Sequence, residues 1–181
     1  MRWFLPLLLL LLVARNDAGE AVLKGLVIND HLGQPHDLEK QAPDHMVLLF
    51  SIAARVDAKA WDDGVSPYLP VSKPLIRIMD LGEVGAEDRP RVVERVTKAL
   101  AGTGVLFVMD WEGAVRKRLG GSNEQAVVVV FDGEGAVLGQ VGGLPTAKNR
   151  TTALGYLRIA PHPPLTDDVT PNPKTDPRRV P

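Results

Sequence analysis

The clearest indication of the fold is the segment Met46-Val47-Leu48-Leu49-Phe50-Ser51-Ile52, which follows Pro43-Asp44 and leads into small residues. An apolar run of this length, without alternation of polar and apolar residues, is typical of a strand buried on both faces. We therefore expect residues 46–52 to form a strand in the centre of a sheet that other elements cover on both sides.

Outward from this strand, apolar segments alternate with helical patterns. Further strands are predicted at 23–29, 75–79, 105–109, 127–131 and 136–141, and helices at 57–61, 88–101, 112–119 and from Thr146 onward. Strands that are separated by helices mostly run parallel, because a parallel pair needs a long crossover connection. The turn Asp132-Gly133-Glu134-Gly135 predicts an antiparallel hairpin. An α/β fold follows, with a mixed central sheet between two layers of helices.

Three helix starts carry capping signals. Asp57 and Asp88 are predicted N-caps, because a carboxylate can accept from the free N–H groups of a first turn. Thr146 is the predicted cap of the last helix. The helix after Asp88 has an apolar stripe at helical spacing: Val92, Val93, Val96, Ala99 and Leu100. Three prolines make residues 65–74 a predicted loop.

The two ends of the chain differ from the middle in composition. Residues 1–21 combine Arg2 with a leucine-rich run of about ten residues, which is typical of a signal peptide and short for a membrane span of about 20 residues. An uncleaved N-terminal anchor stays open as the alternative. Residues 161–181 are rich in proline and poor in apolar side chains, so we expect a disordered tail. Residues 22–160 are left as one domain.

Charge and composition exclude several functions. The net charge of −1 gives no electrostatic footprint for nucleic acid or for an anionic membrane. The chain has no cysteine, so it can form no disulfide and carry out no thiol chemistry. The predicted domain must therefore be stabilised by buried apolar surface, and its length allows a sizeable core.

The element order, closing in the hairpin of 127–131 and 136–141 and a final helix, resembles the redoxin branch of the thioredoxin-like superfamily. The run Ile52-Ala53-Ala54-Arg55-Val56-Asp57-Ala58-Lys59 resembles the small periplasmic YtfJ-type family within that branch. The resemblance implies a thioredoxin-like three-layer sandwich over about residues 22–158 and an exported, periplasmic or secreted protein. It implies little about activity, because YtfJ-type proteins have no established one.

The departures from active redoxins are informative. In active members, a reactive cysteine or a Cys-x-x-Cys pair opens the helix after the first core strand, and a cis-proline faces it. Arg55 and Ala58 lie nearest to the two cysteine positions, and residues 122–126 contain no proline. Both halves of the redox site are missing together, so the resemblance implies a different use of the same region.

A helix N-terminus still favours anions, because its N–H groups and dipole point outward. Arg55 adds a forked donor that suits a carboxylate or a phosphate. We therefore predict a ligand site for a small anion or a peptide carboxylate formed by Arg55, Asp57, Lys59 and Asn123. The alternative is that Arg55 simply pairs with Asp57 or with another surface acid.

Two other groups of residues have side chains that could serve a site. His31, His36 and His45, with Asp37 and Asp44 nearby, include ligand types for a metal, but their spacing matches no metal motif, and we predict surface histidines and no metal. The adjacent acids Asp62 and Asp63 beside Trp61 are expected to face water rather than act in acid–base catalysis.

Three functions remain open. The first is a non-redox binding or accessory module for a protein or peptide, without a cofactor. The second is an enzyme without a thiol, or a redoxin-type oxidoreductase homologue, that uses a pocket near Arg55. The third is a redoxin homologue with no activity of its own. The lack of a recognisable pair of nucleophile and base favours the first and the third.

Overall fold

The structure is a computed structural model, and it describes residues 21–161. The signal-peptide and tail predictions fall almost entirely on residues outside this range. The elements are β1 (Val27–Asn29), β2 (Pro35–Asp37), α1 (Leu38–Gln41), β3 (Met46–Ser51), α2 (Arg55–Val65), η1 (Ser66–Tyr68), β4 (Ile76–Asp80), α3 (Arg89–Leu100), β5 (Phe107–Asp110), α4 (Ala114–Leu119), β6 (Val127–Phe131), β7 (Val137–Gly142) and α5 (Ala147–Tyr156).

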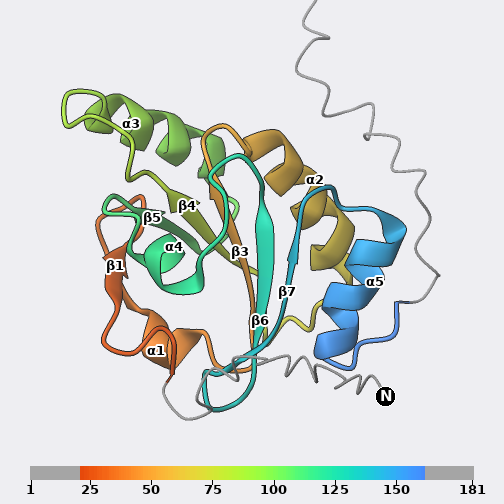
Figure 1. The fold of residues 1–181 in the computed structure, drawn as a ribbon. Coiled ribbons are helices and arrows are strands. Elements are labelled where there is room, and N and C mark those ends of the chain that lie inside the picture. The colour runs from red at the N-terminus through yellow and green to blue at the C-terminus, as the bar shows by residue number, and fades with distance from the viewer. Residues whose placement is uncertain (1–20, 162–181) are drawn as a thin grey trace, which may run out of the picture.

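The main sheet has five strands in the order β5-β4-β3-β6-β7 (Figure 1). Strands β3, β4 and β5 are parallel, whereas β6 is antiparallel to both β3 and β7. The sheet is therefore mixed, as predicted, and β3 lies at its centre. A separate antiparallel pair, β1 and β2, stands beside it.

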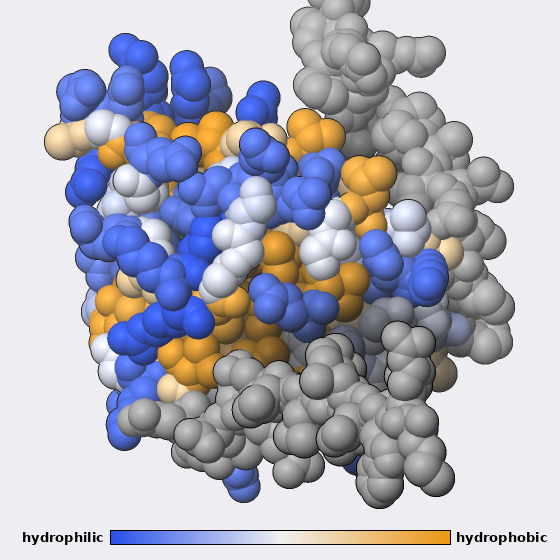
Figure 2. Space-filling view, viewed as in Figure 1, coloured by the Kyte–Doolittle hydropathy of each residue, from blue (hydrophilic) through white to orange (hydrophobic). Residues whose placement is uncertain are grey.

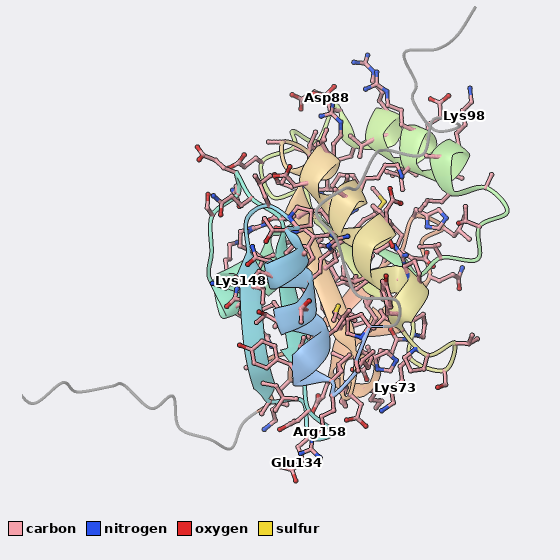
Figure 3. All side chains as sticks on the ribbon, turned by 90° about the vertical axis from the view of Figure 1, so that its right-hand side faces the viewer. Lys73, Asp88, Lys98, Glu134, Lys148 and Arg158 are labelled. Carbon is pink, nitrogen blue, oxygen red and sulfur yellow. The ribbon has the colours of Figure 1, made fainter. Side chains whose placement is uncertain are left out.

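Both faces of β3 are buried, and successive residues enter two different cores. Met46, Leu48 and Phe50 pack with residues of α2 and α5 on one face. Val47 and Leu49 pack with residues of α1 and α4 on the other. Because neighbouring side chains on a strand point to opposite faces, only a continuous apolar run can supply both cores. Figure 3 shows α2 and α5 together in front of the sheet.

Helix α3 covers the same face as α2, but less tightly. Its apolar residues Val92, Val93, Val96 and Leu100 are partly buried against the core, and none of its residues is fully buried. Figure 2 shows hydrophobic side chains along the side of α3 that faces the sheet, below a row of hydrophilic ones. The predicted apolar stripe is therefore present but incompletely covered.

The capping predictions had mixed outcomes. Thr146 accepts a hydrogen bond from the Asn149 backbone N–H at 3.2 Å, as predicted for the last helix. Asp88 is in the N-cap position of α3, but its side chain makes no capping bond. The prediction for Asp57 was wrong: Ala54 is the N-cap of α2, and Asp57 lies within the first turn.

Helix α2 also differs from the prediction at its far end. It continues to Val65 and into η1, where the sequence suggested a loop from residue 65. The buried side chains Trp61 and Val65 explain the extension, because they attach the second half of the helix to the core. The Trp61 Nε1 atom also donates to the Gly143 carbonyl at 2.8 Å. None of the helices in residues 21–161 is both long and apolar enough to cross a membrane.

Candidate functional site

The three parallel strands each end in a polar residue, and these residues lie side by side. Ser51 at the end of β3 is paired in register with Asp80 at the end of β4, and Asp80 with Asp110 at the end of β5. All three are buried. Ligand sites in open α/β sheets lie at the carboxyl ends of the strands, so this row marks the end of the sheet where a candidate site is expected.

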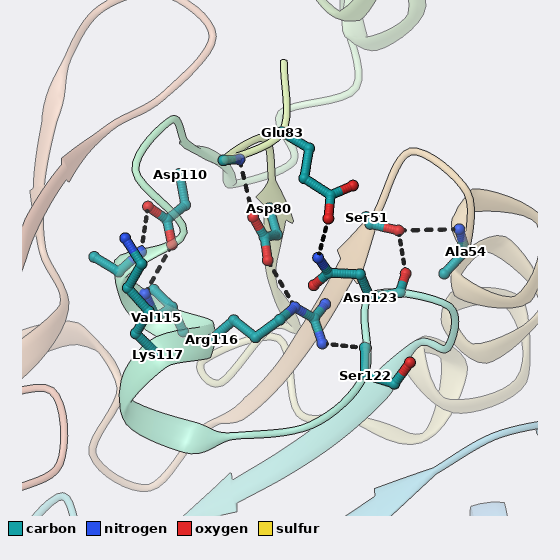
Figure 4. A network of polar contacts seen from close by, with 12 residues as sticks. Ser51, Ala54, Asp80, Glu83, Asp110, Val115, Arg116, Lys117, Ser122 and Asn123 are labelled. Atoms are coloured by element: carbon teal, nitrogen blue, oxygen red, sulfur yellow. Dashed lines mark hydrogen bonds and ion pairs between the residues drawn. The ribbon is translucent and has the colours of Figure 1, made fainter. Parts of the chain in front are cut away.

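Asp110 has a structural task at this edge. Its two carboxylate oxygens accept hydrogen bonds from the backbone N–H groups of Ala114, at 3.0 Å, and Val115, at 2.8 Å (Figure 4). These are free N–H groups in the first turn of α4, and a carboxylate there is stabilised by the helix dipole. Asp110 therefore holds the start of α4 against the end of β5.

Asp80 forms the central ion pair of the site. Its Oδ2 atom lies 2.6 Å from the Nε atom of Arg116 on α4, and its Oδ1 atom accepts from the Gly82 N–H at 3.0 Å. The side chains of Asp80 and Arg116 are only 7% and 8% exposed. Arg116 Nη1 also donates to the Ser122 carbonyl at 2.5 Å. One guanidinium thus connects α4, the end of β4 and the segment before β6.

Asn123 joins this network from the segment before β6. Its backbone carbonyl accepts from the Ser51 hydroxyl, and its Nδ2 atom donates to Glu83 at 2.7 Å. Ser51 Oγ in turn accepts from the Ala54 N–H at 3.3 Å, at the start of α2. The segment that would carry a cis-proline in an active redoxin is therefore held to the end of β3 by a serine.

Two polar atoms of the network are buried and have no hydrogen-bond partner. They are Nη2 of Arg116, a donor, and Oδ1 of Asn123, an acceptor. The two side chains point toward each other in Figure 4 without a hydrogen bond between these atoms. Buried polar groups are normally paired, so a group that both accepts and donates would satisfy the pair.

Two cavities flank this network. One of about 660 Å³ is lined by the segments at Ser51–Ala53 and Ser122–Glu124 and by Glu83. The other, of about 560 Å³, lies beyond Asp80 between Glu83 and α4, and Arg116 and Asn123 line it as well. Asp80, Glu83 and Asn123 belong to both, so the polar network forms the wall between them.

The residues that the sequence predicted as a site are not all brought together. Arg55 is the first residue of α2, as expected, and its Nη1 atom donates to the Ile52 carbonyl at 3.2 Å. Arg55 and Lys59 line a third cavity, on the other side of α2 from Asn123, and Asp57 lines none of the three. Within residues 21–161, Arg55 has no ion pair with Asp57 or with any other acid.

The three histidines take separate roles. His36 Nε2 lies 3.0 Å from Asp30 Oδ2, His45 Nδ1 lies 2.7 Å from the Pro43 carbonyl, and the His31 carbonyl accepts from Thr97. Burial raises the pKa of Asp30, but the hydrogen bonds from His36 and from the Gln34 and Leu32 backbones outweigh it and lower that pKa below its ordinary value. In the described part of the chain, no group of three or more His, Asp or Glu residues could hold a metal ion.

The acids beside Trp61 also have identified partners. Asp62 accepts from Arg77 Nε and Nη2, each at 2.6 Å, and Asp63 accepts from Lys59 at 2.7 Å. Sequence reasoning missed Ser51, Asp80, Asp110 and Arg116 as site residues. A signal for the first three was present, because each is the polar residue that directly ends a buried apolar strand.

Comparison with known proteins gives a likeness in structure only. A scan against protein-family models finds no match, and a search of curated proteins finds none either. Among solved structures, the exposed lipoprotein thioredoxin Etrx1 from Streptococcus pneumoniae has a TM-score of 0.54 at 12% identity, covering 72% of this chain and 96% of its own.

StoA from Bacillus subtilis has a TM-score of 0.52 at 13% identity and covers 74% of this chain and 98% of its own. A putative electron transfer protein from Aquifex aeolicus has a TM-score of 0.51 at 17% identity, with 73% and 89% covered. At such low identity these structures inform on the fold and not on the activity. The chain has a thioredoxin-like fold without a cysteine, and the carboxyl ends of its parallel strands carry a buried Asp80–Arg116 ion pair with the partly exposed Asn123 beside it.

Proposed function

We propose that this chain is an exported, non-redox binding module. It holds an extended peptide segment of a partner protein at the carboxyl ends of its parallel strands. The observation that carries the proposal is the buried pair of unsatisfied atoms, Arg116 Nη2 and Asn123 Oδ1. A peptide group offers a carbonyl to the donor and an N–H to the acceptor, and Arg116 and Asn123 both line the cavity of about 560 Å³.

The adjoining cavity of about 660 Å³, which Asn123 lines without Arg116, gives room for an extended ligand. It runs between the start of α2 and the segment before β6, and it is lined by Ser51, Ile52 and Ala53 on one side and Ser122, Asn123 and Glu124 on the other. The loops are held in place by the Ser51 and Asp80–Arg116 contacts, so the site would need little ordering when a peptide binds.

The absence of cysteine supports a binding role without redox catalysis. The position that opens the helix is Arg55, and the second cysteine position is Ala58, which is buried against the core. We expect background rates in disulfide reduction and peroxide reduction by the purified chain. Turnover above that background would contradict the non-redox assignment.

The assignment to the YtfJ-type family and the export of the chain belong to this proposal. The Ile52–Lys59 run and the leucine-rich N-terminus support them. Cell fractionation, with N-terminal sequencing of the extracytoplasmic form, tests export. A chain found only in the cytoplasm would contradict it.

Peptide selection tests the binding function directly. A library of displayed random decapeptides would be selected on the immobilised full chain, and the recovered peptides titrated against wild type and Asn123→Ala. Loss of one hydrogen bond to a buried acceptor should weaken binding about fivefold to tenfold, or about 1 kcal/mol. The matched control is Gln140→Ala, an exposed position on the edge strand β7.

Peptides that bind both variants as tightly as wild type would contradict the proposed site. Failure to recover any peptide that binds saturably would contradict the peptide-binding function. An ordered water bridging Arg116 and Asn123 in a high-resolution crystal of the peptide complex, with the peptide elsewhere, would also count against the site.

A further inference from the structure

A third cavity lies on the opposite side of α2, between α2 and α3 and above the sheet. Its volume is about 590 Å³, within the range of about 300–1,000 Å³ usual for small-molecule sites. The floor is apolar and comes from three neighbouring strands, with Phe50, Met79 and Phe107 among its residues. The rings of Phe50 and Phe107 pack edge to face, with their centroids 5.9 Å apart.

Helix α3 forms the outer wall of this cavity. Val96, Ala99 and Leu100 line it from α3, and no residue of that helix is fully buried. An amphipathic helix normally buries its apolar stripe, because each methylene removed from water is favourable. The half-covered stripe therefore leaves apolar surface available to a ligand that fills the space.

The charges around the cavity mouth favour an anion. Four of the six charged lining residues pair with one another: Lys59 with Asp63 at 2.7 Å, and Arg77 with Asp62 at 2.6 Å. The other two are Arg55 on α2 and Arg95 on α3, both exposed, and neither has an ion pair with an acid of residues 21–161. Both acids at the mouth are thus neutralised while two arginines are not.

We propose that this groove binds a single-chain amphiphilic carboxylate, such as a free fatty acid. The acyl chain lies over Phe50, Met79 and Phe107, and the carboxylate faces Arg55 or Arg95, whose forked guanidinium groups match its two oxygens. The proposal goes beyond the peptide site and does not depend on it, because the groove shares no lining residue with the two cavities at the sheet edge.

Carboxylates with acyl chains of increasing length test the contact between the acyl chain and the apolar floor of the groove. Octanoate, decanoate and dodecanoate, each below its critical micelle concentration, would be titrated against the full chain by calorimetry and by NMR of the methionine methyl groups. Affinity should rise about fourfold for each added methylene, with saturable shifts at Met79. Affinity independent of chain length would overturn the proposal, as would shifts scattered over all methionines.

Variants that remove the charge of Arg55 or Arg95 test whether these arginines bind the carboxylate. Arg55→Gln and Arg95→Gln should each weaken decanoate binding about twofold to fivefold, because exposed ion pairs contribute modestly. Binding of decanol, which has no charge, should not change. The control Lys98→Gln is also on α3 and exposed, but it does not line the groove (Figure 3). Equal losses for decanol and decanoate would overturn the assigned head group.

A blocking variant tests the location. Ala99 is exposed and lines the groove, so Ala99→Trp should fill the cavity and abolish decanoate binding without unfolding the chain. Retained binding in a folded Ala99→Trp variant would overturn the site.

Two further measurements distinguish a free carboxylate from two other occupants of the groove, a membrane lipid and a second copy of this chain. Binding to phosphatidylglycerol vesicles that Ala99→Trp abolishes would overturn a free carboxylate in favour of a membrane lipid. Concentration-dependent Met79 shifts without any ligand would overturn it in favour of a second copy of this chain.

Discussion

The buried pair of Asp80 and Arg116 allows a quantitative prediction about folding. The two side chains are 7% and 8% exposed, and they meet at 2.6 Å between Oδ2 and Nε. The perturbation is Arg116→Met, which keeps much of the volume of the side chain but removes its charge and donors. Asp80 would then retain the Gly82 N–H as its hydrogen-bond partner, and the Ser122 carbonyl would lose its bond from Arg116.

The magnitude follows from the burial of the remaining charge. Removing one partner of a buried ion pair costs about 3–5 kcal/mol, because the other charge stays uncompensated. Whole domains are stable by about 5–15 kcal/mol, so this loss is a large fraction of the free energy of unfolding. With an m-value of about 2 kcal/mol/M, the urea midpoint should fall by about 1.5–2.5 M.

Urea unfolding followed by tryptophan fluorescence and circular dichroism measures the effect. The double variant Asp80→Asn/Arg116→Met should recover about 1–3 kcal/mol of the loss, because no buried charge is left. The control Lys59→Gln breaks an exposed pair with Asp63 and should change the stability by no more than about 0.5 kcal/mol. A loss below about 1 kcal/mol for Arg116→Met, or a double variant no more stable than the single one, would show that the Asp80 charge is not left uncompensated in the variant.

Three further predictions concern other contacts. Asp110→Ala should cost about 1–2 kcal/mol and speed amide exchange at Ala114 and Val115, whose N–H groups donate to its carboxylate; unchanged exchange would show that α4 needs no such cap. Trp61→Phe should lower the free energy of unfolding by about 1–3 kcal/mol in thermal or urea unfolding, because the Gly143 carbonyl loses its donor; an unchanged stability would count against that bond. The pKa of Asp30 is lowered in the folded state, so its contribution to stability is present above about pH 4 and lost as the pH falls through the folded pKa. An Asp30→Asn variant should therefore lose less stability than wild type as the pH is lowered below about 4.

The sequence alone was enough for the core of the fold. The unbroken run at residues 46–52 predicted a central strand buried on both faces, and the Asp-Gly turn at 132–135 predicted the hairpin of β6 and β7. These patterns are local, because the burial of a strand and the geometry of a turn both depend on the types of adjacent residues. The absence of cysteine excludes thiol chemistry on composition alone, whatever fold the chain adopts.

Predictions of helix boundaries from local sequence were wrong where tertiary packing sets the boundary. Asp57 had the chemistry of an N-cap, but α2 begins two residues earlier, at Arg55, with the Ser51 hydroxyl accepting from the Ala54 N–H. The prolines predicted a loop from residue 65, but α2 continues to Val65 and is followed by η1, because Trp61 and Val65 pack into the core. Tertiary burial thus outweighed the turn propensity of this segment.

Residue types and their spacing were sufficient to predict the layered α/β architecture and to exclude thiol chemistry. Which polar residues contact one another depends on how distant segments pack. Asp80 and Arg116 are 36 positions apart, and Ser51 and Asn123 are 72 apart. Their contacts depend on the parallel register of β3, β4 and β5 and on the packing of α4, and no local pattern records how distant strands are aligned.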